Sequence, residues 1–321
     1  MKAFVTGGTG FIGQRVIKRL RSRGDEVVAL VRDPSKAIGL LDEGVQLIEG
    51  DLSSDDAIKR GVEGADGVFH IAAVYKVGIP KKDRPAMYDA NVRGTERILD
   101  ASEAAGVGRI LYVSTGNVFG DTKGAVVDET YERNRDDGFL SYYDETKFRS
   151  HELVRERIAR GAPIVIAQPG AVYGPGDHSE IGNLIDQIRT GKLKMRMFPE
   201  ARFNFVFVDD VADGLVRVFD KGRIGESYLL GGELTSMNDL YEKTAAHLGK
   251  TPPKMAMPVG MAKASAPLGP VIGPLMGFPP NMKELVKTSN VTIAFRDDKA
   301  RSELGYNGRG LDEGLRDTVP A

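Results

Sequence analysis

The amino-acid sequence predicts an α/β protein with a doubly wound parallel sheet of the Rossmann type and a smaller, interleaved C-terminal lobe. Two observations lead to this prediction. Short runs rich in Val and Ile recur along the first half of the chain without alternating polar residues, as in strands that are buried on both faces. The sequence between successive runs is long enough for a helix, and repeated strand–helix units form doubly wound sheets.

Six strands are expected in this part of the chain, at residues 3–6, 27–31, 45–49, 68–72, 110–114 and 164–168. Four helices are expected, at residues 12–23, 55–61, 91–105 and 143–160. Gly61 ends the second helix and Gly106 follows the third, which is typical of helix C-termini because glycine readily adopts a left-handed conformation.

After residue 169 the pattern is less regular. A strand at 203–208 and a helix at 209–220, capped by Asp209 and Asp210, are expected to return to the sheet. We therefore expect a Rossmann domain at residues 1–168, to which 202–230 return, and a second lobe made mainly of residues 169–321. Residues 252–282 hold eight of the 16 prolines and five of the 10 methionines, which suits either an irregular lobe surface or a lid over an apolar ligand.

Composition excludes several classes of function. The chain has no cysteine and only four scattered histidines, so we expect no disulfide and no metal site. Its 44 basic and 45 acidic residues give a net charge of −1, which provides no overall attraction to nucleic acid or to an anionic membrane. The chain also lacks an apolar run of membrane-spanning length and an N-terminal signal pattern, so we expect a soluble, cytoplasmic protein.

A glycine-rich loop with the sequence TGGTGFIG follows the first strand at residues 6–13. Gly7 permits a tight turn, Gly10 lets the backbone approach a pyrophosphate, and Gly13 permits close packing of the helix. Phe11 and Ile12 complete the loop at the helix N-terminus, where backbone amides attract negative charge. The loop therefore predicts a dinucleotide-binding site.

The end of the second strand bears on the choice of cofactor. Arg32 is suited to the 2′-phosphate of NADP, and Lys36 could add positive charge. Asp33 is an argument for NAD, because an acidic residue here can accept hydrogen bonds from a ribose 2′-hydroxyl. NADP is the expected cofactor and NAD the alternative.

Asp51 and Leu52 follow the third strand at the same edge of the predicted sheet. The Asp51 side chain and the neighbouring backbone could hold an adenine. An aspartate in this position could equally cap the next helix.

Tyr143 and Lys147 stand four residues apart on a predicted helix, so their side chains share one face. A lysine ammonium beside a tyrosine favours the phenolate, which would suit the tyrosine for proton transfer near neutral pH. Ser114 and Thr115 end the fifth strand, where a hydroxyl could hydrogen-bond a substrate carbonyl or simply belong to a turn.

The chain resembles, along nearly its whole length, the extended short-chain dehydrogenases/reductases of the NAD-dependent epimerase/dehydratase type. The matching segments occur in the order typical of that family, at residues 6–13, 50–52, 70–73, 91–95, 113–115, 143–147, 168–176 and 208–212. The resemblance implies that Thr115 is the catalytic hydroxyl, that Tyr143 is the acid/base, and that Lys147 orients the nicotinamide ribose and lowers the pKa of Tyr143. It also implies cofactor contacts at Ala72, Ala73, Pro169 and Val172.

Within this family, residues 31–34 resemble the dihydroflavonol 4-reductase-like branch, in which such an arginine meets NADP. Phe207 stands where nucleotide-sugar epimerases have a histidine, and phenylalanines at 203, 205 and 207 suit an apolar substrate. We therefore expect an NADPH-dependent oxidoreductase that reduces a small, apolar ketone or aldehyde to an alcohol, or catalyses the reverse. The alternatives are a nucleotide-sugar epimerase/dehydratase and a non-catalytic NADP sensor. The resemblance also implies a homodimer in which the helix at 143–160 packs against its equivalent.

Overall fold

The computed structural model of the chain describes residues 1–319 with the exception of 258–259, 261–263, 265–281 and 288–289. Most of the proline- and methionine-rich segment 252–282 therefore lies outside the described residues. No helix in the described part of the chain is long and apolar enough to cross a membrane.

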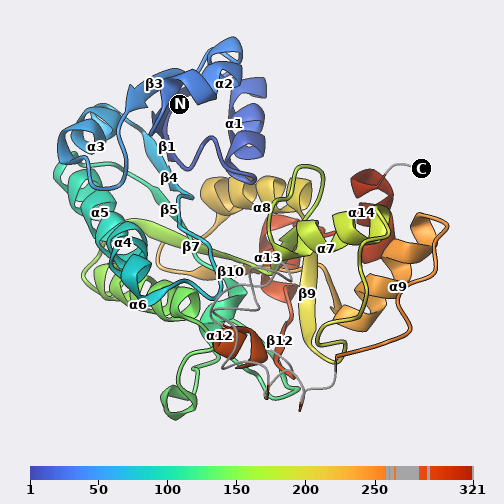
Figure 1. Cartoon of the computed structure of the whole chain (residues 1–321). Helices are drawn as coiled ribbons and strands as arrows, with labels where there is room; N and C mark the ends of the chain where they lie inside the picture. The colour runs from blue at the N-terminus through green and yellow to red at the C-terminus, as the bar shows by residue number, and fades with distance from the viewer. Residues whose placement is uncertain (258–259, 261–263, 265–281, 288–289, 320–321) are drawn as a thin grey trace.

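A seven-stranded parallel sheet forms the centre of the larger lobe (Figure 1). Its strand order is β10-β7-β5-β4-β1-β2-β3. The strands are β1 (Lys2–Thr6), β2 (Glu26–Val31), β3 (Gln46–Glu49), β4 (Gly67–His70), β5 (Ile110–Val113), β7 (Ile164–Pro169) and β10 (Ser227–Leu230). The direction of the strand order reverses between β1 and β4, and ligands of such sheets bind in the crevice at this point.

Helices cover both faces of this sheet. On one face lie α1 (Gly13–Ser22), α8 (Val208–Lys221) and α13 (Asp298–Leu304), and on the other α3 (Asp55–Val62), α5 (Gly94–Ala104) and α6 (Tyr142–Ala159). Ala3 and Val5 of β1 belong to the first core and Phe4 to the second, so the strand is apolar on both sides. This double burial explains why the strands show no polar alternation.

Shorter elements connect these units. They are η1 (Pro34–Ala37), α2 (Ile38–Asp42), η2 (Lys81–Asp83), α4 (Arg84–Tyr88), the π-helical turn η3 (Asp89–Arg93), η4 (Gly116–Phe119) and η5 (Arg135–Asp137).

A smaller sheet forms the second lobe, with the order β11-β9-β12-β6 and with β8 paired to β9. Its strands are β6 (Val126–Val127), β8 (Ala171–Tyr173), β9 (Arg202–Phe207), β11 (Glu233–Ser236) and β12 (Thr292–Phe295). Helices α7 (Glu180–Arg189), α9 (Met237–His247) and α14 (Leu311–Thr318) pack around it, and α12 spans Met282–Lys287.

The structure confirms the predicted fold class, and the expected strands and helices of the first half are present with ends that differ by a few residues. One expectation is wrong: the strand at 203–208 does not return to the large sheet. It forms β9 and pairs with β8, β11 and β12, while β10 takes the place beside β7. Because β9 and β10 are both short and apolar, the sequence pattern does not indicate which of them joins the large sheet.

Candidate active site

A single cavity of about 1420 Å³ lies at the carboxyl ends of β1, β4, β5 and β7 and extends into the smaller lobe. The larger lobe contributes the glycine loop, the residues after β4, the end of β5 and the start of α6. The smaller lobe contributes an apolar wall and also polar and charged side chains, among them Asp177, His178, Glu180, Lys192 and Lys194. The cavity exceeds the roughly 300 to 1,000 Å³ of a typical ligand pocket, so it has room for a cofactor and a substrate together.

The glycine loop fits the pyrophosphate of a dinucleotide. Gly7 has a φ of +76°, and a Cβ atom there would lie 2.8 Å from the backbone nitrogen of Ala72. A Cβ atom on Gly13 would collide with the Gly7 carbonyl. The loop therefore requires glycine at both positions, and it presents the N-terminus of α1 to the cavity, where anions are favoured.

A buried polar chain behind this loop positions the residues after β4. The Thr6 hydroxyl lies 2.8 Å from Nδ1 of His70, whose Nε2 lies 2.9 Å from the Thr95 hydroxyl. The Ala72 amide donates to the same Thr6 hydroxyl at 3.3 Å. Burial, together with the charge of Lys147, lowers the pKa of His70 to about 3, so this side chain is neutral.

Thr115, Tyr143 and Lys147 all line the cavity. Thr115 lies two residues after β5 and caps η4, where its hydroxyl accepts a hydrogen bond from the Asn117 amide at 3.2 Å. Ser141 caps α6 by accepting from the Asp144 amide at 3.1 Å. The helix therefore starts immediately before Tyr143 and places Tyr143 and Lys147 on one face.

The surroundings of Tyr143 differ from the expectation in one respect. Burial raises the pKa of Tyr143, with smaller contributions from Tyr112, Asp144 and Glu180, whereas the sequence led us to expect a lowered value. Within the described residues, Lys147 donates from Nζ to the Val113 carbonyl at 2.9 Å and to the Tyr112 hydroxyl at 3.3 Å, and not to Tyr143.

The cavity brings together most of the residues that the sequence suggested. These are Gly7, Gly10, Phe11, Ile12, Gly13, Ala72, Ala73, Thr115, Tyr143, Lys147, Pro169 and Val172. Arg32, Lys36, Asp51 and Leu52 do not line it. They follow the neighbouring strands β2 and β3, beyond the glycine loop.

Arg32 is exposed at this edge of the sheet. Hydrogen bonds from Ser53 lower the pKa of Asp51, and the charge of Arg32 lowers it further. The Asp33 carboxylate accepts hydrogen bonds from the Ser35 amide at 3.0 Å and the Ser35 hydroxyl at 2.6 Å. Its second oxygen lies 3.3 Å from Nζ of Lys36. Asp33 and Lys36 are thus engaged with local partners.

Several cavity residues were not found from the sequence. Tyr75 is one of them and packs edge-on against Tyr143, with 4.7 Å between ring centroids. Ser114, which the sequence did suggest, also lines the cavity and lies 3.0 Å from Nδ1 of His151. The apolar wall comes from Met195, Met197, Phe198, Phe203, Met237, Tyr241, Val291 and Ile293, of which the sequence suggested only Phe203. Phe205 and Phe207, suggested with it, are buried in the core and do not line the cavity. Apolar residues far apart in the sequence give no periodic signal that they share one wall.

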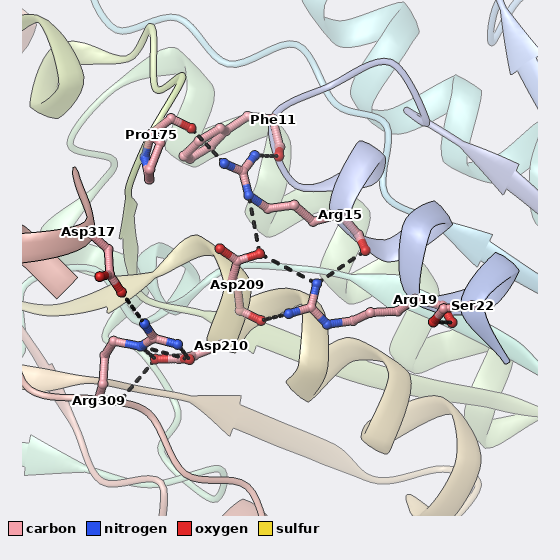
Figure 2. A network of polar contacts seen from close by, with 9 residues as sticks. All are labelled: Phe11, Arg15, Arg19, Ser22, Pro175, Asp209, Asp210, Arg309 and Asp317. Carbon is pink, nitrogen blue, oxygen red and sulfur yellow. Dashed lines mark hydrogen bonds and ion pairs between the residues drawn. The ribbon is translucent and has the colours of Figure 1, made fainter. Parts of the chain in front are cut away.

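Asp209 and Asp210 do not cap α8 as expected. The helix starts at Val208 without a side-chain cap, and both aspartates lie in its first turn. Asp209 pairs with arginines of α1, and Asp210 pairs with Arg309 of the C-terminal segment (Figure 2). Among the described residues, no group of three or more His, Asp or Glu is arranged to hold a metal ion.

The sequence matches the model of the NAD dependent epimerase/dehydratase family over residues 3–231. A protein of Synechocystis sp. named "Putative dihydroflavonol 4-reductase" is 30% identical, covering 98% of this chain and 93% of that protein. A 4-hydroxy-2-methyl-3-oxo-4-farnesyl-3,4-dihydroquinoline-1-oxide ketoreductase of Stigmatella aurantiaca is 31% identical, covering 100% of this chain and 97% of that protein.

A solved structure of MoeE5 in complex with UDP-glucuronic acid and NAD superposes with a TM-score of 0.78. It is 26% identical and covers 99% of this chain and 97% of that chain. The family match spans more than half of the chain, and the two curated relatives span nearly all of it. The chain therefore belongs to the NAD-dependent epimerase/dehydratase family and is an NAD(P)-dependent enzyme of the extended short-chain dehydrogenase/reductase type.

Proposed function

We propose that the chain is an NADPH-dependent oxidoreductase that reduces an apolar ketone or aldehyde to the alcohol, or catalyses the reverse reaction. One observation carries this proposal. Thr115, Tyr143 and Lys147 line the same cavity. The glycine loop lines one end of this cavity, and an apolar wall lines the other.

The apolar wall supports the substrate class. Met195, Met197, Phe203 and Met237 pack around the buried Phe198. Such a surface stabilises an apolar substrate by removing its surface from water, at about 25 cal/mol for each Å² buried. The name of the Stigmatella aurantiaca relative, a ketoreductase of a farnesyl compound, also favours an apolar ketone.

The polar groups at the edge of β2 support NADPH over NADH. Arg32 is exposed and can pair with a phosphate, while Asp33 is already bonded to Ser35 and close to Lys36. A 2′-phosphate gains a cation at this edge, whereas a 2′-hydroxyl would have to compete with Ser35 for the carboxylate.

In the proposed mechanism Tyr143 donates a proton to the carbonyl oxygen, and Thr115 hydrogen-bonds the same oxygen as negative charge develops on it. Lys147 is 4% exposed and donates from Nζ to the Val113 carbonyl at the end of β5, so its side chain is held in a fixed place beside the site. A bound nicotinamide dinucleotide would supply or accept the hydride. The neighbouring apolar wall excludes water from the reacting carbonyl.

The variant Tyr143→Phe tests this mechanism, because it removes only the hydroxyl that donates the proton. We expect ketone-dependent oxidation of NADPH to fall by about 10²- to 10⁴-fold, the usual contribution of acid/base catalysis, while NADPH binding stays within a few-fold. A panel of apolar ketones and aldehydes, followed by loss of NADPH absorbance, measures the first quantity. Tyr142→Phe is the matched control, since the Tyr142 ring packs under Arg84 and lies outside the cavity lining. Near-normal turnover by Tyr143→Phe would contradict the assignment.

A nucleotide-sugar epimerase or dehydratase is the second candidate. The family match and the MoeE5 complex with UDP-glucuronic acid and NAD favour it. Such an enzyme would retain its nicotinamide cofactor and show no net oxidation or reduction of it. Analysis of the nucleotide that the purified protein carries separates the two candidates.

We further propose that residues 1–168, together with α8 and β10 at 208–230, form the unit that binds the cofactor. The rest of 169–321, which includes β9 at 202–207, would mainly bind the substrate. The large cavity between these regions supports this division.

We also propose a cytoplasmic homodimer joined through α6, on the basis of the family to which the chain belongs. Sedimentation at several concentrations tests the dimer.

A further inference from the structure

Arg15 is a side chain of α1 that lies two residues after the glycine loop and lines the cavity. Its Nη1 donates to the Phe11 carbonyl at 2.9 Å, and its Nη2 donates to the Pro175 carbonyl at 2.6 Å. The guanidinium also lies 4.9 Å from the centre of the Phe11 ring. Figure 2 shows this side chain reaching from α1 toward both carbonyls.

The two carbonyls belong to different parts of the cavity rim. Phe11 belongs to the glycine loop of the larger lobe, and Pro175 follows β8, which belongs to the smaller sheet. Both residues line the cavity, and the chain separates Arg15 from Pro175 by 160 residues. One side chain therefore joins the two lobes at the edge of the space that fits a dinucleotide.

A third element fixes the direction of this side chain. Nε of Arg15 lies 3.5 Å from Oδ1 of Asp209, in the first turn of α8. A carboxylate is favoured in this position because the N-terminus of a helix carries partial positive charge. Arg19, one turn further along α1, lies 3.5 Å from the same oxygen and donates to the Asp209 carbonyl at 2.8 Å.

All three guanidinium nitrogens of Arg15 thus face acceptors of the protein. An arginine bound in this way bridges two segments of the chain. We propose that Arg15 is a positioning residue that fastens residues 174–177 to the glycine loop and thereby sets how fast a bound dinucleotide leaves the cavity. The inference rests on the proposed function to the extent that it takes the cavity to hold a nicotinamide dinucleotide.

The variant Arg15→Ala tests the inference through the rate of cofactor release, which does not depend on turnover. The chain has no tryptophan, so the fluorescence of NADPH itself is followed while excess NADP displaces it in a stopped-flow mixer. We expect release at least about tenfold faster than from the wild type, which corresponds to about 1.4 kcal/mol. Arg15→Lys keeps the charge but cannot reach both carbonyls in the same way, so we expect it to release NADPH nearly as fast as Arg15→Ala.

Arg19→Ala is the matched control. Arg19 contacts Asp209 and the Arg15 carbonyl but neither rim of the cavity, so we expect its release rate to stay within about twofold of the wild type. Thermal unfolding of every variant reports any general loss of stability. Equal release rates for wild type and Arg15→Ala, or equal acceleration by Arg19→Ala and Arg15→Ala, would overturn the inference. A wild-type protein that binds no nicotinamide dinucleotide would overturn the proposed function first, and the inference with it.

Discussion

His70 and His151 are buried near Lys147, one of the candidate catalytic residues. His70 lies between the Thr6 and Thr95 hydroxyls, and His151 lies 3.0 Å from the Ser114 hydroxyl. Burial lowers the pKa of His70 to about 3 and that of His151 to about 4, with further lowering by nearby cations. Both side chains are therefore neutral in the folded protein and would gain a proton on unfolding below about pH 6.5.

These two residues predict how stability depends on pH. Because their folded-state pKa values lie below the unfolded value, their contribution is complete above about pH 6.5 and is lost as pH falls towards 4 and then 3. At pH 5 the histidines take up protons only when the protein unfolds. We therefore expect each of them to lower the free energy of unfolding by about 2 kcal/mol relative to pH 7.5. Urea unfolding at the two pH values measures the loss.

His151→Asn keeps a hydrogen-bonding group for Ser114 but does not titrate in this range, so we expect a smaller difference between the two pH values. The exposed His178, replaced by Asn, is the control. An identical pH dependence for wild type and His151→Asn would contradict this account.

Residue-level prediction from the sequence succeeded where the partners are close along the chain. Tyr143 and Lys147 are one helical turn apart, so their shared face follows from helix geometry, and the structure brings both into the cavity. Arg15 could not be predicted, because its partners Pro175 and Asp209 come from distant segments that only the fold brings together. Lys147 donates to the backbone carbonyl of Val113, and the spacing of side chains along the sequence does not predict such a contact.

At the scale of elements, the start of α6 depends on a buried ion pair. Nη1 of Arg133 lies 2.9 Å from Oδ1 of Asp144, and the two side chains are 4% and 2% exposed. Asp144 also accepts from the Leu140 amide at 2.9 Å, and the guanidinium lies 4.8 Å from the centre of the Phe139 ring and 5.2 Å from that of Phe148. The pair ties the loop before α6 to the turn that carries Tyr143.

Arg133→Met is expected to destabilise the fold by about 3 to 5 kcal/mol, because it leaves the Asp144 carboxylate buried without its partner. Denaturant unfolding measures this difference. Arg155→Met is the matched control, since Arg155 pairs with Glu132 at the surface and its loss should cost about 0 to 1 kcal/mol. A change of less than 1 kcal/mol for Arg133→Met would show that the pair does not anchor α6.

The alternation of strands and helices in the first half was predictable because each buried strand is short, apolar and followed by an amphipathic helix. The second half was harder for a physical reason. β9 and β10 are both short apolar strands, and which of them pairs with β7 depends on tertiary packing. The two-residue β6 is too short to leave a pattern in the sequence.

At the scale of the whole molecule, α8 connects the two lobes. Its first turn carries Asp209, which binds α1 of the larger lobe (Figure 2). It also carries Asp210, which accepts from Nε and Nη2 of Arg309 at 2.8 to 3.1 Å. Arg309 also pairs with Asp317 of α14 at 2.7 Å. One helix end therefore joins the glycine-loop helix to the C-terminal segment.

This arrangement suits a reaction in which a cofactor on one lobe meets an apolar substrate on the other. The measurement that tests it most directly is a side-by-side titration of the purified protein with NADPH and NADH, for wild type and Arg32→Ala, after the nucleotide carried from expression has been identified. We predict exchangeable binding with a preference for NADPH of more than about tenfold, or roughly 1.4 kcal/mol, and a loss of that preference in Arg32→Ala. A retained NAD that resists exchange, or equal binding of both cofactors by the wild type, would contradict an NADPH-dependent reductase.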